Sequence, residues 1–100
     1  MNNRITVKNL ESVITYLNQI TGNKSEPYSR DDNNKFIVNN GVYYLTGAYG
    51  GHKLEQMDLT GSGSHDVLNT GFTSKKSLYY AIHTYIYGIE AGLKLKNTEL

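Results

Sequence analysis

The chain has 100 residues and is nearly neutral, with ten Lys or Arg against nine Asp or Glu and a net charge of +1. This balance argues against nonspecific binding to duplex DNA, because such proteins carry a large basic excess, and equally against an acidic DNA mimic. The absence of cysteine excludes disulfides, thiolate zinc sites and cysteine nucleophiles.

One hundred residues suit one hydrophobic core, so residues 1–100 are predicted to form a single domain. Nine tyrosines make up much of the 38% of hydrophobic residues, and the aliphatic core that remains is thin. A thin core favours modest stability, or stability shared with a second subunit. No apolar run approaches the ~18 residues of a membrane span, and the N-terminus lacks the hydrophobic block of a signal peptide. We therefore expect no membrane association and a cytoplasmic location.

The first predicted element is a helix that begins near Thr6 and ends at Gly22. Threonine suits the N-cap position, and glycine suits the left-handed residue that ends many helices. The apolar stripe at helical spacing consists of Leu10, Val13, Ile14, Leu17 and Ile20. Residues 23–34, around the only proline, are expected to form a polar loop.

A hairpin is predicted next, with Asn40-Gly41 as a type I′ turn between strands 35–39 and 42–46. The resulting cross-strand pairs are Val38 with Tyr43, Ile37 with Tyr44 and Phe36 with Leu45. One face of this hairpin is expected to meet the helices, and the second face is too apolar to lie in water.

Beyond the hairpin the pattern is less regular. Residues 47–51 are expected to break the sheet, and residues 52–59 form a third strand whose uneven spacing indicates a bulge. A turn at residues 61–64 precedes a short fourth strand at Val67-Leu68. The predicted fold class is α+β, in the order α-β-β-β(-β)-α, with a short antiparallel sheet packed with two amphipathic helices.

The final helix is predicted to begin at Thr73 or Ser74. Its buried stripe consists of Leu78, Ile82, Tyr85, Ile86, Ile89 and Leu93. Aromatic residues also occupy the other faces, so we expect part of this helix to pack on another subunit. Gly88 and Gly92 indicate the close approach of another backbone, from the first helix or from a symmetry mate, with fraying near the end of the chain as the alternative.

The start of this helix, Thr73-Ser74-Lys75-Lys76, is an unusual place for two lysines, because a helix N-terminus already carries partial positive charge. Together with free backbone N–H groups and neighbouring hydroxyls, these lysines suit a phosphate or another anion. The alternative is that both lysines are ordinary solvated surface residues.

The run Gly47-Ala48-Tyr49-Gly50-Gly51 is a second candidate site, because glycines let a backbone approach a ligand closely and Tyr49 offers a stacking face. The run is not a P-loop, since no Gly-Lys-Ser/Thr follows, and it lacks the spacing of a dinucleotide-binding fingerprint. The alternative is a tight irregular connection after a strand.

Catalytic and metal sites are not favoured. The three histidines have no metal-ligand spacing with a neighbouring acid, so structural or surface roles are preferred and neither a metal nor a cofactor is expected. Ser64-His65-Asp66 has the residue types of a catalytic triad, but neighbours in sequence cannot adopt the geometry of one. This segment is therefore interpreted as a turn, and no enzyme activity is predicted.

Four segments together resemble a known family: Asn18–Gly22, Glu26-Pro27-Tyr28, Gly47–Gly51 and Asp66-Val67-Leu68. The chain resembles, over about residues 10–92, a widespread family of small and mostly uncharacterised bacteriophage proteins with a mid-chain Gly-Ala-Tyr-Gly-Gly segment. No established activity comes with this resemblance. It implies a phage product in the host bacterial cytoplasm that serves host takeover or counter-defence by binding a host component or sequestering a signal molecule.

The leading hypothesis is a nonenzymatic binding protein, a homodimer or higher oligomer, with a pocket for a small anionic or nucleotide-like ligand. The ligand-binding residues predicted for this pocket are Tyr28, Arg30, Tyr44, Gly47, Tyr49, Gly50, Gly51, Thr73, Ser74, Lys75 and Lys76. The alternative is a protein–protein inhibitor of a host bacterial factor, with the same tyrosines as its interface. A further alternative is an accessory protein that binds single-stranded nucleic acid, against which the near-neutral charge weighs.

Overall fold

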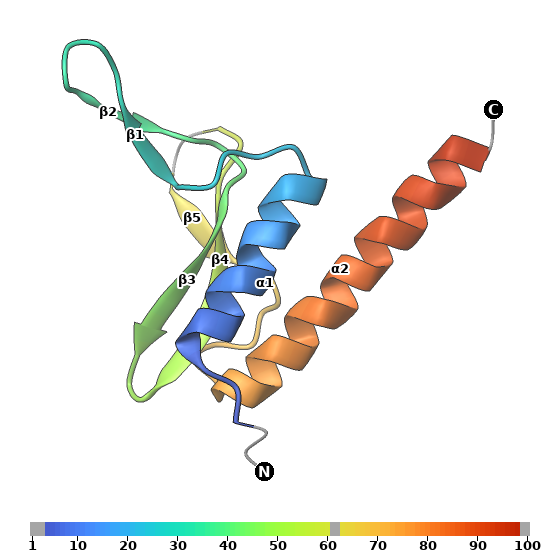
Figure 1. The fold of residues 1–100 in the computed structure, drawn as a ribbon. Coiled ribbons are helices and arrows are strands. Elements are labelled where there is room, and N and C mark those ends of the chain that lie inside the picture. The colour runs from blue at the N-terminus through green and yellow to red at the C-terminus, as the bar shows by residue number, and fades with distance from the viewer. Residues whose placement is uncertain (1–3, 61–62, 99–100) are drawn as a thin grey trace.

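The computed structural model describes residues 4–60 and 63–98, which form two helices and five strands (Figure 1). In chain order these are α1 (Val7–Ile20), β1 (Tyr28–Arg30), β2 (Phe36–Val38), β3 (Tyr43–Ala48), β4 (Gly51–Met57), β5 (Ser64–Asp66) and α2 (Lys75–Thr98). The strands make two antiparallel sheets, the pair β1-β2 and a three-stranded sheet in the order β3-β4-β5. The predicted α+β class is confirmed, with more strands than expected and with those strands divided between two sheets.

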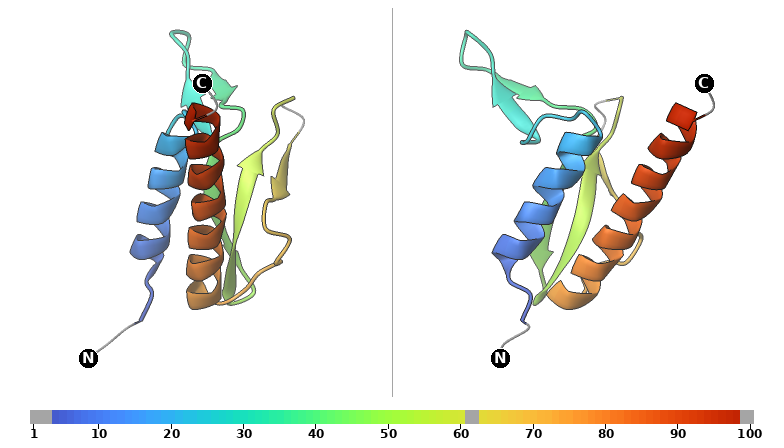
Figure 2. Two further views of the ribbon diagram at one scale, coloured as in Figure 1. Left: turned by 90° about the vertical axis from the view of Figure 1, so that its right-hand side faces the viewer. Right: turned by 45° about the vertical axis from the view of Figure 1, so that its right-hand side comes forward.

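Two layers make up the body of the molecule. The helices lie side by side on one face of the three-stranded sheet and run in the same direction (Figures 1 and 2). α1 packs on β3, α2 packs on β4, and the helices pack on each other. The pair β1-β2 projects from these layers, and we call residues 28–38 the arm (Figure 1). Neither helix in the described part of the chain has the length and apolarity to span a bilayer.

The core lies between the helices and the sheet. Its buried residues are Leu10, Val13, Ile14 and Leu17 of α1, Tyr43 and Leu54 of the sheet, and Leu78, Ile82 and Ile86 of α2. The predicted stripes of both helices are therefore confirmed, except that Leu93 is 43% exposed. Tyr43 is the one core side chain with a hydroxyl, and that hydroxyl lies 2.8 Å from the hydroxyl of Tyr85 on α2.

Polar side chains fix the starts of both helices. The Thr6 hydroxyl accepts the N–H of Asn9 at 3.1 Å, and the Asn9 side chain accepts the N–H of Thr6 at 2.9 Å. The Ser74 hydroxyl likewise accepts the N–H of Ser77 at 3.1 Å. These bonds satisfy backbone donors that have no partner inside a helix. The predicted starts are confirmed, and so is the left-handed Gly22 after α1, with a φ of 75°.

The predicted hairpin around Asn40-Gly41 is wrong, because the strands on its two sides pair with other partners. β2 pairs with β1, and β3 pairs with β4, so the expected contacts between β2 and β3 do not form. A type I′ turn needs positive φ at both central residues, and here Gly41 alone has it, with a φ of 85°. The Asn39 carbonyl accepts the N–H of Val42 at 3.4 Å, so this turn links the two sheets instead.

Type I′ geometry occurs at Tyr49-Gly50, inside the run expected to break the sheet. The φ angle is 54° at Tyr49 and 75° at Gly50, and Ala48 pairs with Gly51 on either side. β3 and β4 are thus joined by a two-residue hairpin, and the predicted break at residues 47–51 is wrong. The sequence conceals this turn because a bulky tyrosine occupies a position where Asn, Asp or Gly is usual.

The later strands correct two further expectations. The third strand is confirmed as β4, but the expected bulge is absent, because the register between β3 and β4 is continuous. The fourth strand lies at Ser64–Asp66 instead of Val67-Leu68, so Ser64-His65-Asp66 is a strand and not a turn. The chain turns after Asp66, whose carboxylate accepts the N–H of Gly71 at 2.8 Å. Residues 61–62 of the turn predicted at 61–64 lie outside the described residues.

Candidate functional site

The arm carries four exposed large hydrophobic side chains on a hairpin of three residue pairs. The exposed fractions are 49% for Tyr28, 70% for Phe36, 44% for Ile37 and 41% for Val38. Successive strand residues point to opposite faces, so Ile37 makes one face apolar while Phe36 and Val38 make the other apolar. An isolated two-stranded hairpin is at best marginally stable in water, and exposed apolar clusters mark interaction surfaces. The arm is therefore suited to being covered by another molecule.

The tip of the arm is organised by its own polar groups. The Asp31 carboxylate accepts the N–H of Lys35 at 2.9 Å, which closes the turn. Arg30 donates to the carbonyl of Asn34 at 2.9 Å, and its guanidinium carbon lies 4.2 Å from the centre of the Phe36 ring. A cation is attracted to an aromatic face, so Arg30 stabilises the arm itself. Its role in meeting the charge of a ligand stays a prediction.

The base of the arm is held by Asn39, which is 8% exposed. Its backbone N–H donates to the Pro27 carbonyl at 2.8 Å. Its side-chain amide donates to the Glu26 carbonyl at 2.8 Å and to the Ser29 hydroxyl at 2.6 Å. Because these bonds join the segments that enter and leave the arm, they hold its base together.

A groove of about 340 Å³ lies between α1 and β3. Its walls include Glu11, Ile14 and Thr15 of α1 and Tyr44 and Leu45 of β3. Asn18, which is buried, links these two elements beside the groove. Its amide nitrogen donates to the Tyr43 carbonyl at 3.0 Å, and its amide oxygen accepts the Tyr43 N–H at 2.9 Å.

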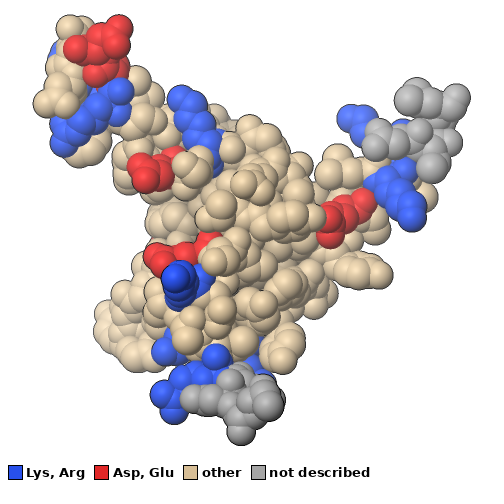
Figure 3. All heavy atoms as spheres, in the orientation of Figure 1, with Lys and Arg blue, Asp and Glu red and all other residues tan. Residues whose placement is uncertain are grey.

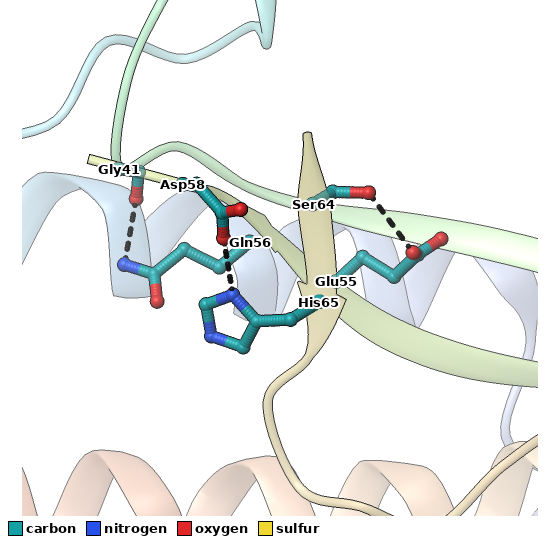
Figure 4. Close-up of polar contacts among 6 residues, drawn as sticks. All are labelled: Gly41, Glu55, Gln56, Asp58, Ser64 and His65. Carbon is teal, nitrogen blue, oxygen red and sulfur yellow. Dashed lines mark hydrogen bonds and ion pairs between the residues drawn. The ribbon is translucent and has the colours of Figure 1, made fainter. Parts of the chain in front are cut away.

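A polar cluster centred on Glu55 occupies the sheet face that points away from the helices. The Glu55 carboxylate accepts the Thr46 hydroxyl at 2.5 Å. It also accepts the Ser64 hydroxyl at 3.1 Å (Figure 4). The pKa of Tyr44 is raised, mainly because the side chain is partly buried. A hydrogen bond with Ser64 partly offsets this rise in pKa, and the charge of Glu55 adds to it. These contacts join neighbouring strands, so the cluster has a clear structural role.

His65 points to the opposite face of β5 from Ser64. Its Nδ1 lies 2.8 Å from Oδ1 of Asp58, while the Ser64 hydroxyl faces Glu55 (Figure 4). Ser64 and His65 are therefore separated, and with Asp66 they assemble no catalytic triad. Across residues 4–60 and 63–98, no group of three or more His, Asp or Glu is placed to hold a metal ion.

The tip of the β3-β4 hairpin meets the segment that leads into α2. His52 and Thr73 exchange two backbone hydrogen bonds of 2.8 Å. A Cβ atom on Gly51 would lie 3.0 Å from the backbone nitrogen of Thr73, so glycine is needed where these segments cross. Tyr49 is 95% exposed, and its ring stands edge to face with Phe72 at 5.6 Å between centres. The predicted close approach at the glycine run thus serves the chain's own backbone.

The structure divides the predicted ligand residues between two ends of the molecule. Tyr28 and Arg30 lie on the arm, and Tyr44 lies near the start of β3. The second group, at the opposite end of β3, consists of Gly47, Tyr49, Gly50, Gly51, Thr73, Ser74, Lys75 and Lys76. The extended chain from Tyr44 to Tyr49 spans about 16 Å, so one small ligand does not reach both groups. Anion binding by the second group stays a prediction.

α2 presents a further exposed surface. Tyr80 is 58% exposed, Tyr87 78% and Leu95 65%. An ideal Cβ atom on Gly88 or Gly92 meets nothing within 4 Å, so α1 does not approach these glycines closely. Packing of a second copy against them stays a prediction.

Comparisons with known proteins add no identity. No protein-family model matches the chain, and no curated protein or solved structure matches it. The resemblance to bacteriophage proteins therefore stays an expectation from the quoted segments.

Charge is mixed over the face shown in Figure 3. Basic and acidic side chains lie together on the arm and again on the far part of α2 (Figure 3). Several basic side chains gather at the lower end of this face, but no basic patch extends across the face, in keeping with the net charge of +1 (Figure 3). Nucleic-acid surfaces typically show a basic stripe or patch, so this distribution does not favour that class of partner.

The arm was not predicted from the sequence, because residues 23–34 were expected to form a loop. A signal was present. Two short segments, 28–30 and 36–38, carry aromatic and β-branched residues on either side of Asp31-Asp32-Asn33-Asn34. Asp and Asn favour turns, so these segments have the composition of a hairpin.

Proposed function

We propose that this protein is a nonenzymatic binding protein whose partner is another protein and whose main contact is the arm. The observation that carries the proposal is the exposure of Tyr28, Phe36, Ile37 and Val38 on both faces of one projecting hairpin. Aromatic residues and arginine are enriched in the centres of protein interfaces, and Arg30 stacked on Phe36 is a compact example of that pair.

The shape of the surface favours a protein over a small ligand. Small-molecule sites are concave and bury most of the ligand, whereas the arm is convex and projects from the body. Of the tyrosines predicted to bind the ligand, Tyr49 lies at the opposite end of β3 from Tyr28 and Tyr44, so the three do not line one pocket. These features support the protein–protein inhibitor hypothesis over sequestration of a nucleotide-like ligand.

The bacteriophage resemblance supplies the context for this proposal. A phage protein that binds another protein inside its host is expected to meet a host bacterial factor, and host takeover or counter-defence would follow from blocking that factor. The factor can be identified by crosslinking, because exposed side chains of the arm can be replaced with photoreactive ones.

Site-specific photo-crosslinking tests the proposal. A photoreactive phenylalanine analogue replaces Phe36 in one variant and Leu59 in another, and each variant is irradiated in bacterial cells. Leu59 is a matched control because it is 78% exposed and lies outside the arm, while Phe36 is 70% exposed. We expect one discrete heterologous protein crosslinked at position 36 and absent at position 59.

Three results would contradict this proposal. Equal crosslinking at both positions would mean that contact is nonspecific. A crosslink to nucleic acid would support the single-stranded nucleic-acid hypothesis, and a nucleotide that copurifies in stoichiometric amount without any crosslinked protein would restore the small-ligand hypothesis.

A further inference from the structure

β3 is an edge strand, and no strand among the described residues pairs with its outer side. The sheet order β3-β4-β5 leaves one side of β3 unpaired. In an antiparallel pair, alternate residues direct their N–H and C=O groups toward the partner strand and away from it. Tyr43 directs both groups away from β4, because both bond to Asn18. By the same alternation, the N–H and C=O groups of Leu45 and Gly47 also point outward.

Asn18 shows that this edge accepts a peptide-like partner. A side-chain amide has the same donor and acceptor groups as a backbone peptide unit. Asn18 donates one hydrogen bond to the backbone of Tyr43 and accepts one from it. An added strand would make the same two bonds. The corresponding groups of Leu45 and Gly47 have no such partner in the described part of the chain.

The two edges of this sheet differ in how they are protected. Natural edge strands avoid unwanted pairing by being short or by carrying charged residues or proline. β5 fits this description, since it has three residues and includes Asp66. β3 has six residues, Tyr-Tyr-Leu-Thr-Gly-Ala, with neither charge nor proline. Its edge therefore has the composition of a pairing surface.

The groove between α1 and β3 gives this edge space for an occupant. Leu45 lies on the β3 side of the groove, and Glu11 and Thr15 lie on the α1 side. Glu11 is the charged residue that lines it, and no cation pairs with its carboxylate among residues 4–60 and 63–98. An occupant that carries a basic side chain would complement this acid.

We propose that the β3 edge binds an extended segment of a partner protein as an added strand, with a basic side chain of that segment facing Glu11. The strand's backbone bonds to Leu45 and Gly47, and the groove receives its side chains, as in other cases of strand addition. A second copy of this chain is the less suitable occupant, because its β3 brings no positive charge to Glu11. The inference rests on the proposed protein partner but uses a surface separate from the arm.

The test uses peptides as probes. Random ten-residue peptides displayed on a library are selected against the wild-type protein, and hydrogen exchange of the backbone amides is measured with each selected peptide. We expect the amides of Leu45 and Gly47 to exchange at least tenfold more slowly with peptide, while Tyr43, already bonded to Asn18, changes little. Lysine or arginine is expected to be enriched in the selected sequences.

Matched variants separate this site from the arm. Glu11→Lys should weaken the selected peptides at least tenfold, whereas Ser12→Lys, one residue along α1 and outside the groove, should leave affinity unchanged. Protection that increases with protein concentration and needs no peptide would overturn the proposal in favour of pairing between two copies. The proposal would also be overturned if no peptide were selected. It would be overturned as well if the selected peptides left the amides of Leu45 and Gly47 unprotected and no longer bound the Phe36→Ala variant. That last result would contradict strand addition at β3 and would not contradict the proposed binding by the arm. A failed crosslink at position 36 would contradict binding by the arm and would not affect the exchange measurement.

Discussion

We predict that Asn18→Ala lowers the free energy of unfolding by about 2–4 kcal/mol. Asn18 is 2% exposed and makes two hydrogen bonds of 2.9 and 3.0 Å to the backbone of Tyr43. Alanine removes both at once, and each buried backbone group left without a partner costs about 1–3 kcal/mol. Two such groups account for the upper part of the range. Water that enters from the neighbouring groove would satisfy one of them and accounts for the lower part.

Urea unfolding followed by circular dichroism measures this loss, with equal slopes required for wild type and variant. Asn40→Ala is the matched control, since Asn40 is exposed and its amide makes one bond of 3.2 Å to the Leu59 carbonyl. We expect the control to lose less than about 0.5 kcal/mol. If Asn18→Ala loses no more than Asn40→Ala, then Tyr43 does not depend on Asn18 and our account of the β3 edge is refuted.

Asn18→Asp tests the same contact through its pH dependence. An ionised carboxylate still accepts the Tyr43 N–H, but it cannot donate to the Tyr43 carbonyl, whereas the protonated acid can. Burial and the carbonyl together raise the pKa of this acid in the folded state. Relative to wild type, the variant is therefore most stable below the unfolded pKa of about 3.9 and loses stability as pH rises through the folded value. Relative stability that increases with pH over this window would contradict the assigned bonds.

Four other expectations can be checked with the purified wild-type protein and its variants. Burial, and then a hydrogen bond with another tyrosine, raise the pKa of Tyr43, so stability is retained below about pH 10 and falls as pH rises further. Tyr43→Phe should flatten this alkaline loss in thermal melts, and an equally steep loss would refute the assignment. Gly51→Ala should destabilise the fold by about 1–3 kcal/mol, because its methyl group would lie 3.0 Å from backbone atoms, and an unchanged melting temperature would contradict that contact. In light scattering, the wild-type protein is expected to show a mass above that of the monomer. Gly88→Leu should reduce this mass without destabilising the monomer, since nothing lies within 4 Å of the new Cβ atom. A monomeric wild-type protein at high concentration would rule out self-association. Replacing Lys75 and Lys76 together with glutamate should abolish any calorimetric binding of nucleotides or cyclic dinucleotides while leaving α2 as stable or more stable, and unaltered binding would refute an anion site there.

Local chemistry explains why both helices were predictable. Thr6 and Ser74 act through hydrogen bonds to residues three positions away, and the apolar stripes repeat within one element. Information of this kind is contained in a short stretch of sequence. The α+β class followed from the same local patterns.

The prediction of strand pairing failed because the turn residues gave a misleading signal. Asn40-Gly41 is the stronger hairpin signal in isolation, yet β3 pairs with β4 through Tyr49-Gly50. Gly50 permits the positive φ of that turn, whereas Gly51 is needed where the hairpin crosses Thr73, a contact between segments far apart in the sequence. No local pattern connects those two positions. For the same reason, the division of the predicted ligand residues between two ends became visible in the structure alone.

The direct packing of α1 on α2 has a consequence for how the chain folds. The Tyr16 hydroxyl bonds to Glu90, 74 residues further along, and both helices contribute to one cluster. A nascent chain therefore leaves the part of α1 that packs on α2 uncovered until α2 has been synthesised. Contacts of such large sequence separation slow folding, and uncovered apolar surface favours aggregation in the interval. We expect slow refolding from denaturant and a strong benefit from chaperones that shield α1 during synthesis.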